Sequence, residues 1–305
     1  MGHPLTSSDG PAIARPRLSA VVELLKPITW FAPMWAYACG VVSAGQAFEG
    51  RWLEILLGVL LAGPLVCGTS QAVNDWYDRH VDAINEPDRP IPSGRVPGQW
   101  GLYIGLMWSV VSLVAAAALG VWALAAASVG LVLAWAYSAP PIRLKQDGWK
   151  GATAVAACYE GLPWFTGAAI MAGTLPDWRI CLIAALYSAG AVGIMMLNDF
   201  KAVEGDRRMG IRSLPVQLGI ECAALLACVM MAAPQIAVVA LLIAWAAPWH
   251  AVTVALVLIA QFALMGRLLR EPRKLAPFYN ATGTSLYVTG MMVSAFALSK
   301  LAGAT

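Results

Sequence analysis

Oxygen-bearing side chains gather at two places in an otherwise apolar chain, and the first group lies at residues 74–82, which read NDWYDRHVD. Asn74, Asp78 and Asp82 are spaced four residues apart, so a helix would place them on one face. Like charges at this spacing repel, and near a membrane they are tolerated mainly where a cation sits between them. Oxygen ligands without a His or Cys cluster suit a hard ion, and Mg²⁺ typically joins one or two carboxylates to substrate phosphates. The simpler alternative is a solvated helix end that happens to be acidic.

The second group lies at residues 198–208, which read NDFKAVEGDRR and repeat the Asn-Asp-aromatic opening of the first group. Asp199 and Asp206 are seven residues apart, which is two turns on one face if the helix continues, and Glu204 lies nearby. Two such groups on one side of a membrane would hold a dianionic leaving group between two metal sites. We therefore expect metal ligands among Asn74, Asp78, Asp82, Asp199, Glu204 and Asp206, and catalytic acids at Asp75, Asp78, Asp82 and Asp206.

Basic residues that could bind a diphosphate lie beside these acids. Arg89 falls within NEPDRPIPSG (85–94) and Lys145 within YSAPPIRLK (137–145), where prolines stiffen the loops. A fixed backbone gives a preorganised charge, so these two residues are favoured. Topology signalling alone explains Arg143, Arg207, Arg208 and the basic cluster at 267–274 at least as well. The expected diphosphate-binding set is Asn74, Arg79, Arg89, Lys145, Asn198 and Lys201.

These residues indicate transfer of a prenyl group from a diphosphate without a covalent nucleophile. Mg²⁺ and basic side chains would stabilise the charge that builds on diphosphate as the allylic C1–O bond breaks. The sequence shows no Ser-His-Asp arrangement, and its three histidines lie in a tail, in the first acidic group and in a short outer loop. Glu160 stands apart in the middle of an apolar segment, where an acid is usually paired or functional. It either contacts the acceptor or makes a structural hydrogen bond.

Nine apolar segments must position these groups, and each is about long enough to cross a bilayer. They span residues 19–46, 53–78, 99–118, 121–139, 149–172, 178–199, 214–247, 248–270 and 277–300. Pro234 could divide 214–247 and give ten helices. With nine helices, 17 of the 20 basic residues share the side of the Asp-rich groups, whereas ten would move the 267–274 cluster away. We therefore predict an all-α polytopic membrane protein, with nine transmembrane helices around a central cavity and both Asp-rich motifs at the cytoplasmic face.

Composition agrees with a membrane protein, because 59% of the 305 residues are hydrophobic, only 12% are charged and the mean hydropathy is +0.68. A net charge of +3 is too small to indicate a nucleic-acid partner. The six cysteines lie in apolar segments without a CxxC pair, as is typical of small core residues. Residues 1–18 lack the apolar core of a signal peptide. We expect them to form a mobile cytoplasmic tail ahead of a single domain at 19–305.

These motifs resemble those of the UbiA-type membrane prenyltransferase superfamily over essentially the whole membrane portion. The pattern N-D-x-x-D-x-x-x-D at 74–82 matches the first motif of the superfamily in full. The segments NEPDRPIPSG, WAYSAPPIRLK (135–145) and NDFKAVEGD (198–206) resemble its chlorophyll and bacteriochlorophyll synthase branch, and CYEGLPWFTG (158–167) resembles the bacteriochlorophyll form. One departure is that the second motif is commonly Asp-x-x-x-Asp, whereas Ala202 stands at the first Asp. Asp199 or Glu204 would then act with Asp206.

The resemblance implies a prenyltransferase that moves a geranylgeranyl or phytyl group from its diphosphate to the propionate of bacteriochlorophyllide a. A propionate is already ionised at neutral pH, so it needs no general base. Mg²⁺ is the implied cofactor, with Mn²⁺ as the alternative. The implied location is the inner (intracytoplasmic) membrane, with the N-terminus in the cytoplasm, membrane lipid around the helices and pigment-assembly proteins as candidate partners. A chlorophyllide, quinone or haem O acceptor would use the same metal chemistry. A cation transporter is the remote alternative, and it would place its acids near the bilayer midplane.

Overall fold

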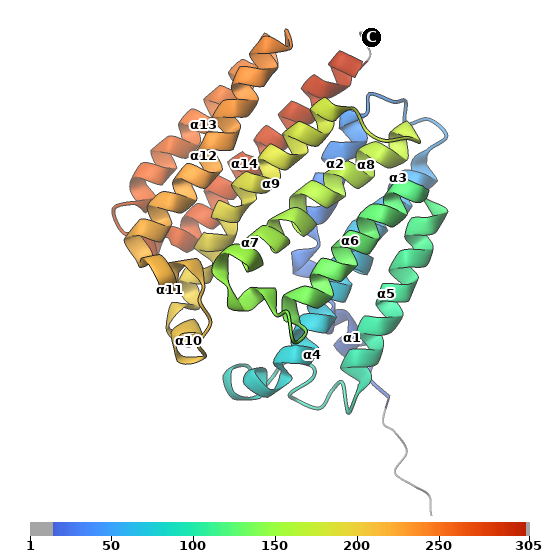
Figure 1. Ribbon diagram of the computed structural model, residues 1–305, viewed down its shortest axis with the longest axis vertical. Helices are drawn as coiled ribbons and strands as arrows, with labels where there is room; N and C mark the ends of the chain where they lie inside the picture. Colours follow the sequence, from blue (N-terminus) through green and yellow to red (C-terminus); the bar gives the residue numbers. More distant parts are fainter. Residues whose placement is uncertain (1–14, 303–305) are drawn as a thin grey trace, which may run out of the picture.

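The computed structural model describes residues 15–302, and all its regular elements are helical. Within that range the only paired extended backbone is an isolated bridge between Asp147 and Arg212. The long helices stand side by side, and their connections gather at the two ends of the bundle (Figure 1). The predicted all-α class is therefore confirmed. Most of the expected tail, residues 1–14, lies outside the described residues, and the first helix begins at Leu18.

Seven helices in residues 15–302 are long and apolar enough to cross a bilayer. Two of them are composite. Trp52–Asn85 joins α3 (Trp52–Leu60), the π-helical stretch η2 (Leu61–Cys67) and α4 (Gly68–Asn85), and Trp178–Lys201 joins α9 (Trp178–Asn198) to the short η5 (Asp199–Lys201). The other five are α5 (Trp100–Ala118), α6 (Val121–Ser138), α12 (Ile220–Ala244), α13 (Pro248–Leu268) and α14 (Pro272–Ala302).

The remaining two expected spans are helical but interrupted. The segment 19–46 is not one helix, because α1 (Leu18–Leu24), η1 (Pro27–Thr29) and α2 (Phe31–Ser43) follow one another. Lys26 has a left-handed backbone with φ of 48°, and Pro27 has no N–H to continue the first helix. The segment 149–172 divides into α7 (Gly148–Ala156), the π-helical η4 (Ala157–Gly161) and α8 (Leu162–Ala172). The exact count of nine spans stays a prediction.

The segment 214–247 stays unbroken at Pro234, as the nine-helix prediction requires. A five-residue helix, α11 (Leu214–Leu218), ends at Gly219, and α12 then continues through the proline to Ala244. The side chain of Gln235, next to the proline, donates to the Met231 carbonyl at 2.8 Å. Gln235 and Gln261 also exchange amide hydrogen bonds of 2.9 and 3.2 Å, which join α12 to α13. Such reciprocal pairs satisfy polar groups where lipid offers no partner.

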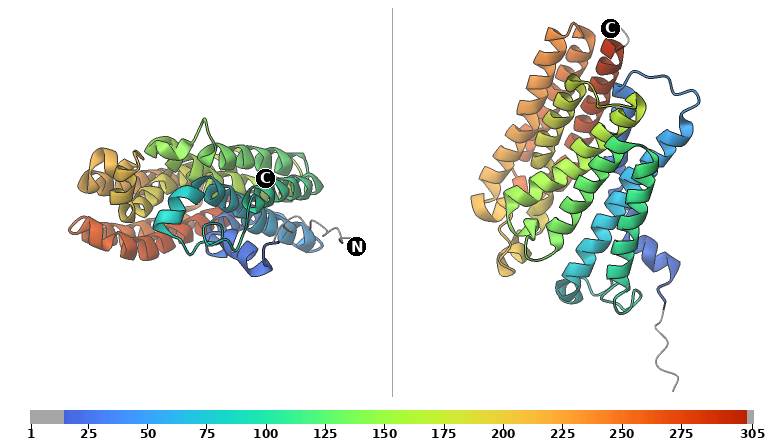
Figure 2. Two further views of the ribbon diagram at one scale, coloured as in Figure 1. Left: turned by 90° about the horizontal axis from the view of Figure 1, so that it is seen from below. Right: turned by 45° about the vertical axis from the view of Figure 1, so that its right-hand side comes forward.

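Close helix contacts depend on glycine. A Cβ atom at Gly40 in α2 would lie 2.0 Å from the carbonyl oxygen of Trp164 in α8, and one at Gly167 would lie 2.3 Å from that of Tyr37. Small residues let two backbones approach in this way inside a membrane. Seen from below, the bundle is flattened, with α14 and the N-terminal helices on one side and the α6 to α8 region on the other (Figure 2).

The longest polar connections meet at one end of the bundle, which is the lower end in Figure 1. This end carries the loop after α4, the loop between α6 and α7, and the segment from η5 through α10 (Val203–Arg208) to α11. The short N-terminal helix α1 lies at the same end. The fold thus brings both Asp-rich segments, far apart in sequence, to one face.

Candidate active site

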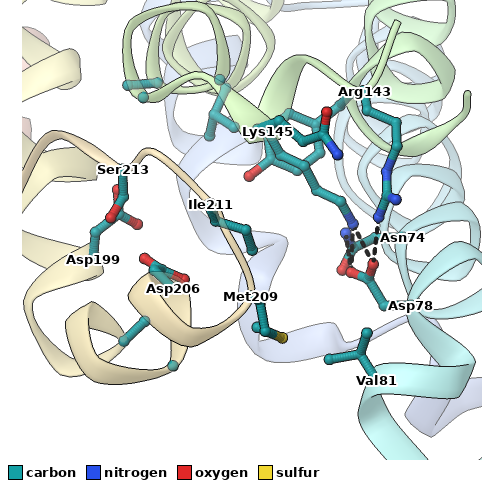
Figure 3. Close-up of a pocket in the computed structure, with 18 of the residues that line it drawn as sticks. Asn74, Asp78, Val81, Arg143, Lys145, Asp199, Asp206, Met209, Ile211 and Ser213 are labelled. Atoms are coloured by element: carbon teal, nitrogen blue, oxygen red, sulfur yellow. Dashed lines mark hydrogen bonds and ion pairs between the residues drawn. The ribbon is translucent and has the colours of Figure 1, made fainter. Parts of the chain in front are cut away.

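A cavity of about 980 Å³ opens at this end between α4, the α6–α7 connection and the segment from α9 to α11. Asn74, Asp78 and Asp82 line one wall, and Asp199 and Asp206 line the opposite wall. Figure 3 shows Asn74 and Asp78 on one side and Asp199 and Asp206 on the other, with Met209 and Ile211 between them. The structure therefore brings the two Asp-rich segments to a single cavity.

The first wall is held in place by hydrogen bonds to neighbouring elements. The Asn74 amide donates to Asp78 and to the hydroxyl of Ser138 at the end of α6, each at 3.1 Å. Lys145 Nζ reaches both carboxylate oxygens of Asp78 at 2.5 Å, and the guanidinium of Arg143 lies 3.6 Å from one of them (Figure 3). Asp78 thus faces two cations from the α6–α7 connection.

Asp82 pairs with Arg89 from the loop that follows α4, at 2.8 Å. Arg89 also contacts Glu86 and lies 3.4 Å from Asp75. Asp75 is only 1% exposed and is not part of the cavity lining. Its other close partner is Lys26 Nζ at 2.7 Å, and its Oδ2 has no hydrogen-bond partner among the described residues. Asp75 therefore stands behind the wall that Asp78 and Asp82 form.

The loop that carries Arg143 and Lys145 is tied to the second wall through its backbone. Lys145 lies in the short helix η3 (Leu144–Gln146), directly after Arg143, whose φ is 38°. Arg212 N–H donates to Gln146 at 3.1 Å, and its carbonyl accepts from Gly148 at 2.9 Å. A Cβ at Gly148 would lie 2.6 Å from the backbone nitrogen of Leu214, so this contact requires glycine. Backbone hydrogen bonds therefore join the loop that carries the two cations to the segment that follows the second Asp-rich group.

Burial perturbs the ionisable groups of the cavity outside the helical spans. Asp206 is only 8% exposed, and this burial raises the pKa of its carboxyl group. The hydroxyl of Ser213 lies near enough to oppose that rise, although its oxygen has no hydrogen-bond partner among the described residues. Burial lowers the pKa of Lys145, although the negative charge of Asp78 opposes that fall. Lys201 also lines the cavity, and no ion pair forms on it within residues 15–302. Burial therefore disfavours the charged forms of Asp206 and Lys145, and Lys201 adds a positive charge that no acid of the described residues pairs with.

Three further residues expected at the site lie away from the cavity. Arg79 folds back on Trp76, donating to its carbonyl at 2.6 Å with the guanidinium 4.1 Å from the ring centroid. Asn198 accepts a hydrogen bond of 2.6 Å from Asn280. Glu204 is exposed and pairs with Arg273 at 3.0 Å. None of the three belongs to the cavity lining.

Arg143, which topology signalling alone could explain, lies in the cavity lining against Asp78. The signal was available, because Arg143 lies on the same proline-stiffened loop as Lys145. Ser213 also lines the cavity and was not among the expected site residues.

The residues present fit a hard divalent cation. The acidic and amide donors of both walls are oxygens, as Mg²⁺ prefers, and the buried Ser213 Oγ beside Asp206 has no hydrogen-bond partner among the described residues. No three carboxyl, imidazole or thiol groups of residues 15–302 converge on one point. That separation suits an ion that takes its remaining ligands from substrate phosphates and water. The candidate metal ligands in the cavity are Asn74, Asp78, Asp82, Asp199 and Asp206.

Comparison with known proteins agrees with this arrangement. Residues 27–288 match the UbiA prenyltransferase family. The chain is 57% identical to the bacteriochlorophyll synthase 33 kDa chain of Cereibacter sphaeroides, with 94% of this chain and 95% of the relative covered. It is 36% identical to the chloroplastic chlorophyll synthase of Oryza sativa, with 91% and 76% covered.

A solved structure of a UbiA homolog from Archaeoglobus fulgidus, bound to GPP and Mg²⁺, has the same fold. The TM-score is 0.64 at 20% identity, with 93% of this chain and 98% of the other covered. The family match, the identity over almost the whole length and the shared fold lead to one conclusion: this chain belongs to the UbiA prenyltransferase family.

Proposed function

We propose that this prenyltransferase transfers a geranylgeranyl or phytyl group from its diphosphate to the propionate of bacteriochlorophyllide a and releases diphosphate. The higher identity to the bacterial bacteriochlorophyll synthase than to the plant chlorophyll synthase supports this acceptor. The observation that carries the reaction type is the cavity itself. It sets two groups of acids opposite each other and adds cations from the loops between them.

We assign one divalent cation to Asn74, Asp78 and Asp82, and a second to Asp199 and Asp206. Mg²⁺ is the proposed ion, with Mn²⁺ as the alternative. The diphosphate would lie between the two walls and accept hydrogen bonds from the cavity cations Arg89, Arg143, Lys145 and Lys201. Arg79, Asn198 and Glu204 receive no role, because they lie outside the cavity. Asp75 receives no direct role either, because it lies behind the wall and outside the cavity lining.

The residues of the chain perform the chemistry by holding charge where the bond breaks. When bound, Mg²⁺ supplies positive charge that offsets the negative charge developing on diphosphate. Lys145 and Arg143 donate to phosphate oxygens as the C1–O bond lengthens, which stabilises the leaving group. A carboxylate oxygen of the acceptor then forms the new bond to C1. Because that carboxylate is already ionised, the site needs no general base.

The proposed setting is the inner (intracytoplasmic) membrane with the cavity facing the cytoplasm. The basic residues concentrate on the side of the two Asp-rich segments, which supports this orientation and a cytoplasmic N-terminus. The esterified pigment would leave into lipid, and pigment-assembly proteins are its proposed receivers. A transporter gains no support, because both Asp-rich segments lie at the polar end of the bundle, in α4 and in η5 to α10.

The test is an ester-forming assay on purified enzyme in detergent with Mg²⁺, geranylgeranyl diphosphate and bacteriochlorophyllide a, followed by chromatography of the pigment. We expect the wild type to form the ester and Asp78→Asn to lose about a hundredfold or more in rate. Asp88→Asn is the matched control, because Asp88 is an exposed acid in the neighbouring loop. If the wild type prenylates a phenolic acceptor and not the pigment, the acceptor assignment is wrong and the prenyltransferase chemistry stands.

A further inference from the structure

Asp75 carries a buried carboxylate whose negative charge the cavity residues do not neutralise by themselves. Its carboxylate is almost completely buried, and a buried ionised acid is tolerated only when it is paired. Arg89 lies 3.4 Å away, but the same guanidinium nitrogen lies closer to Asp82, at 2.8 Å, on the cavity wall. The nearest cation to Asp75 is therefore Lys26, at 2.7 Å.

Lys26 reaches this position from a distant part of the sequence through an unusual backbone. It occupies the left-handed region in the turn after α1, with φ of 48°, and its carbonyl accepts from the Thr29 hydroxyl at 2.8 Å. A residue with a side chain persists in this region only where its surroundings fix it. Leu24 and Leu25 supply part of that fixation, because they are buried in a cluster with Ala72 of α4.

A second ion pair ties the same N-terminal segment to the Arg89 loop. Glu23 pairs with Arg95, which also donates to the carbonyl of Asp88 at 2.5 Å. The N-terminal segment therefore meets the first Asp-rich wall at two points. One point is the pair of Lys26 with Asp75, and the other is the loop that holds Arg89.

We propose that Lys26 is a positioning residue for Arg89 and, through it, for the diphosphate. Lys26 neutralises Asp75, so the guanidinium of Arg89 can be shared with Asp82 at the cavity wall. Without Lys26, Arg89 is the only remaining cation beside a buried carboxylate, and the attraction draws it away from the cavity. This inference rests on the proposed diphosphate site and adds a residue that does not itself line the cavity.

The experiment compares Lys26→Met, Lys26→Arg and the double variant Lys26→Met/Asp75→Asn with the wild type. Arg17→Met is the matched control, because Arg17 is an exposed cation at the start of the same segment. We expect Lys26→Met to raise the KM for geranylgeranyl diphosphate about tenfold, as loss of a supporting residue behind a metal site does, and to leave the KM for the pigment unchanged. Lys26→Arg should stay near the wild type. The double variant should recover, because it removes the charge that displaces Arg89.

A readout that is independent of turnover separates this inference from the proposed function. Inorganic diphosphate with Mg²⁺ should raise the unfolding temperature of the wild type and of the double variant more than that of Lys26→Met. A Lys26→Met enzyme with lower stability but an unchanged donor KM and an unchanged diphosphate shift would overturn the inference. Absence of ester formation by the wild type would instead contradict the proposed acceptor, and the diphosphate shift would still decide the role of Lys26.

Discussion

Replacing Lys145 with methionine is the sharpest test of how the cavity binds diphosphate. The Lys145 ammonium lies 2.5 Å from both oxygens of Asp78, and its side chain is only 10% exposed. Methionine keeps much of the side-chain volume and removes the charge. Arg143 remains 3.6 Å from Asp78, so the acid keeps one cation and the fold should survive.

The expected loss follows from the hydrogen bond that Lys145 would make to the leaving diphosphate. A hydrogen bond to a charged group contributes about 1.5–3 kcal/mol. Since about 1.4 kcal/mol is a factor of ten, kcat/KM for geranylgeranyl diphosphate should fall roughly 10- to 150-fold. The KM for the pigment acceptor should not change, because Lys145 is assigned to the donor.

The assay is steady-state ester formation with the donor varied at saturating pigment, and then the reverse. Lys150→Met is the control, because Lys150 is an exposed lysine just after the same loop. A donor kcat/KM within about twofold of the wild type corresponds to less than about 0.5 kcal/mol and would refute the reasoning. A defect confined to the pigment KM would also refute it.

Two further predictions concern pH and packing. Because burial raises the pKa of Asp206, its carboxylate should take up a proton at a higher pH than an ordinary aspartate. As the pH falls, the Mg²⁺ concentration needed for half-maximal activity should therefore begin to rise at a higher pH than it would with an ordinary aspartate. Titration of Mg²⁺ dependence against pH should show this acid limb in wild type and in Glu204→Gln but not in Asp206→Asn, and an acid limb near the ordinary aspartate pKa of about 3.9 would contradict it. Gly40→Val places a side chain against the Trp164 carbonyl, so it should destabilise the bundle by about 1–3 kcal/mol or more. The unfolding temperature in detergent should fall well below that of Gly266→Ala, where a Cβ meets no atom within 4 Å, and equal temperatures would argue against close α2–α8 packing.

The sequence predicted the helical class, the membrane setting and both Asp-rich segments, because hydropathy and i, i+4 spacing are local properties. It also predicted Arg89 and Lys145 in the cavity, since prolines beside them restrict the loop. The interruption of the first span was missed. A hydropathy pattern does not register a left-handed residue such as Lys26 followed by a proline inside an apolar run.

Glu204 and Asp75 lie outside the cavity because of contacts that a single sequence does not encode. Glu204 is two residues from Asp206, yet it points to Arg273 on α14, whereas Asp206 points into the cavity. Asp75 is adjacent to Asn74, and one step along a helix turns a side chain by about 100°, which takes Asp75 out of the cavity. Its partner Lys26 lies 49 residues earlier in the chain, so only the tertiary structure reveals the pair.

The π-helical stretch at Leu61–Cys67 limits how this span tolerates insertions and deletions. It lies inside the continuous span Trp52–Asn85, ahead of the residues that face the cavity. A π turn holds about one more residue than an α turn, so this stretch can lose one residue by becoming regular α-helix, with little change in the direction of the residues that follow. Deleting a single residue within 61–67 should therefore leave Asn74, Asp78 and Asp82 facing the cavity. A one-residue deletion in the regular α-helix of residues 68–73 should instead turn all three by about 100° toward neighbouring helices.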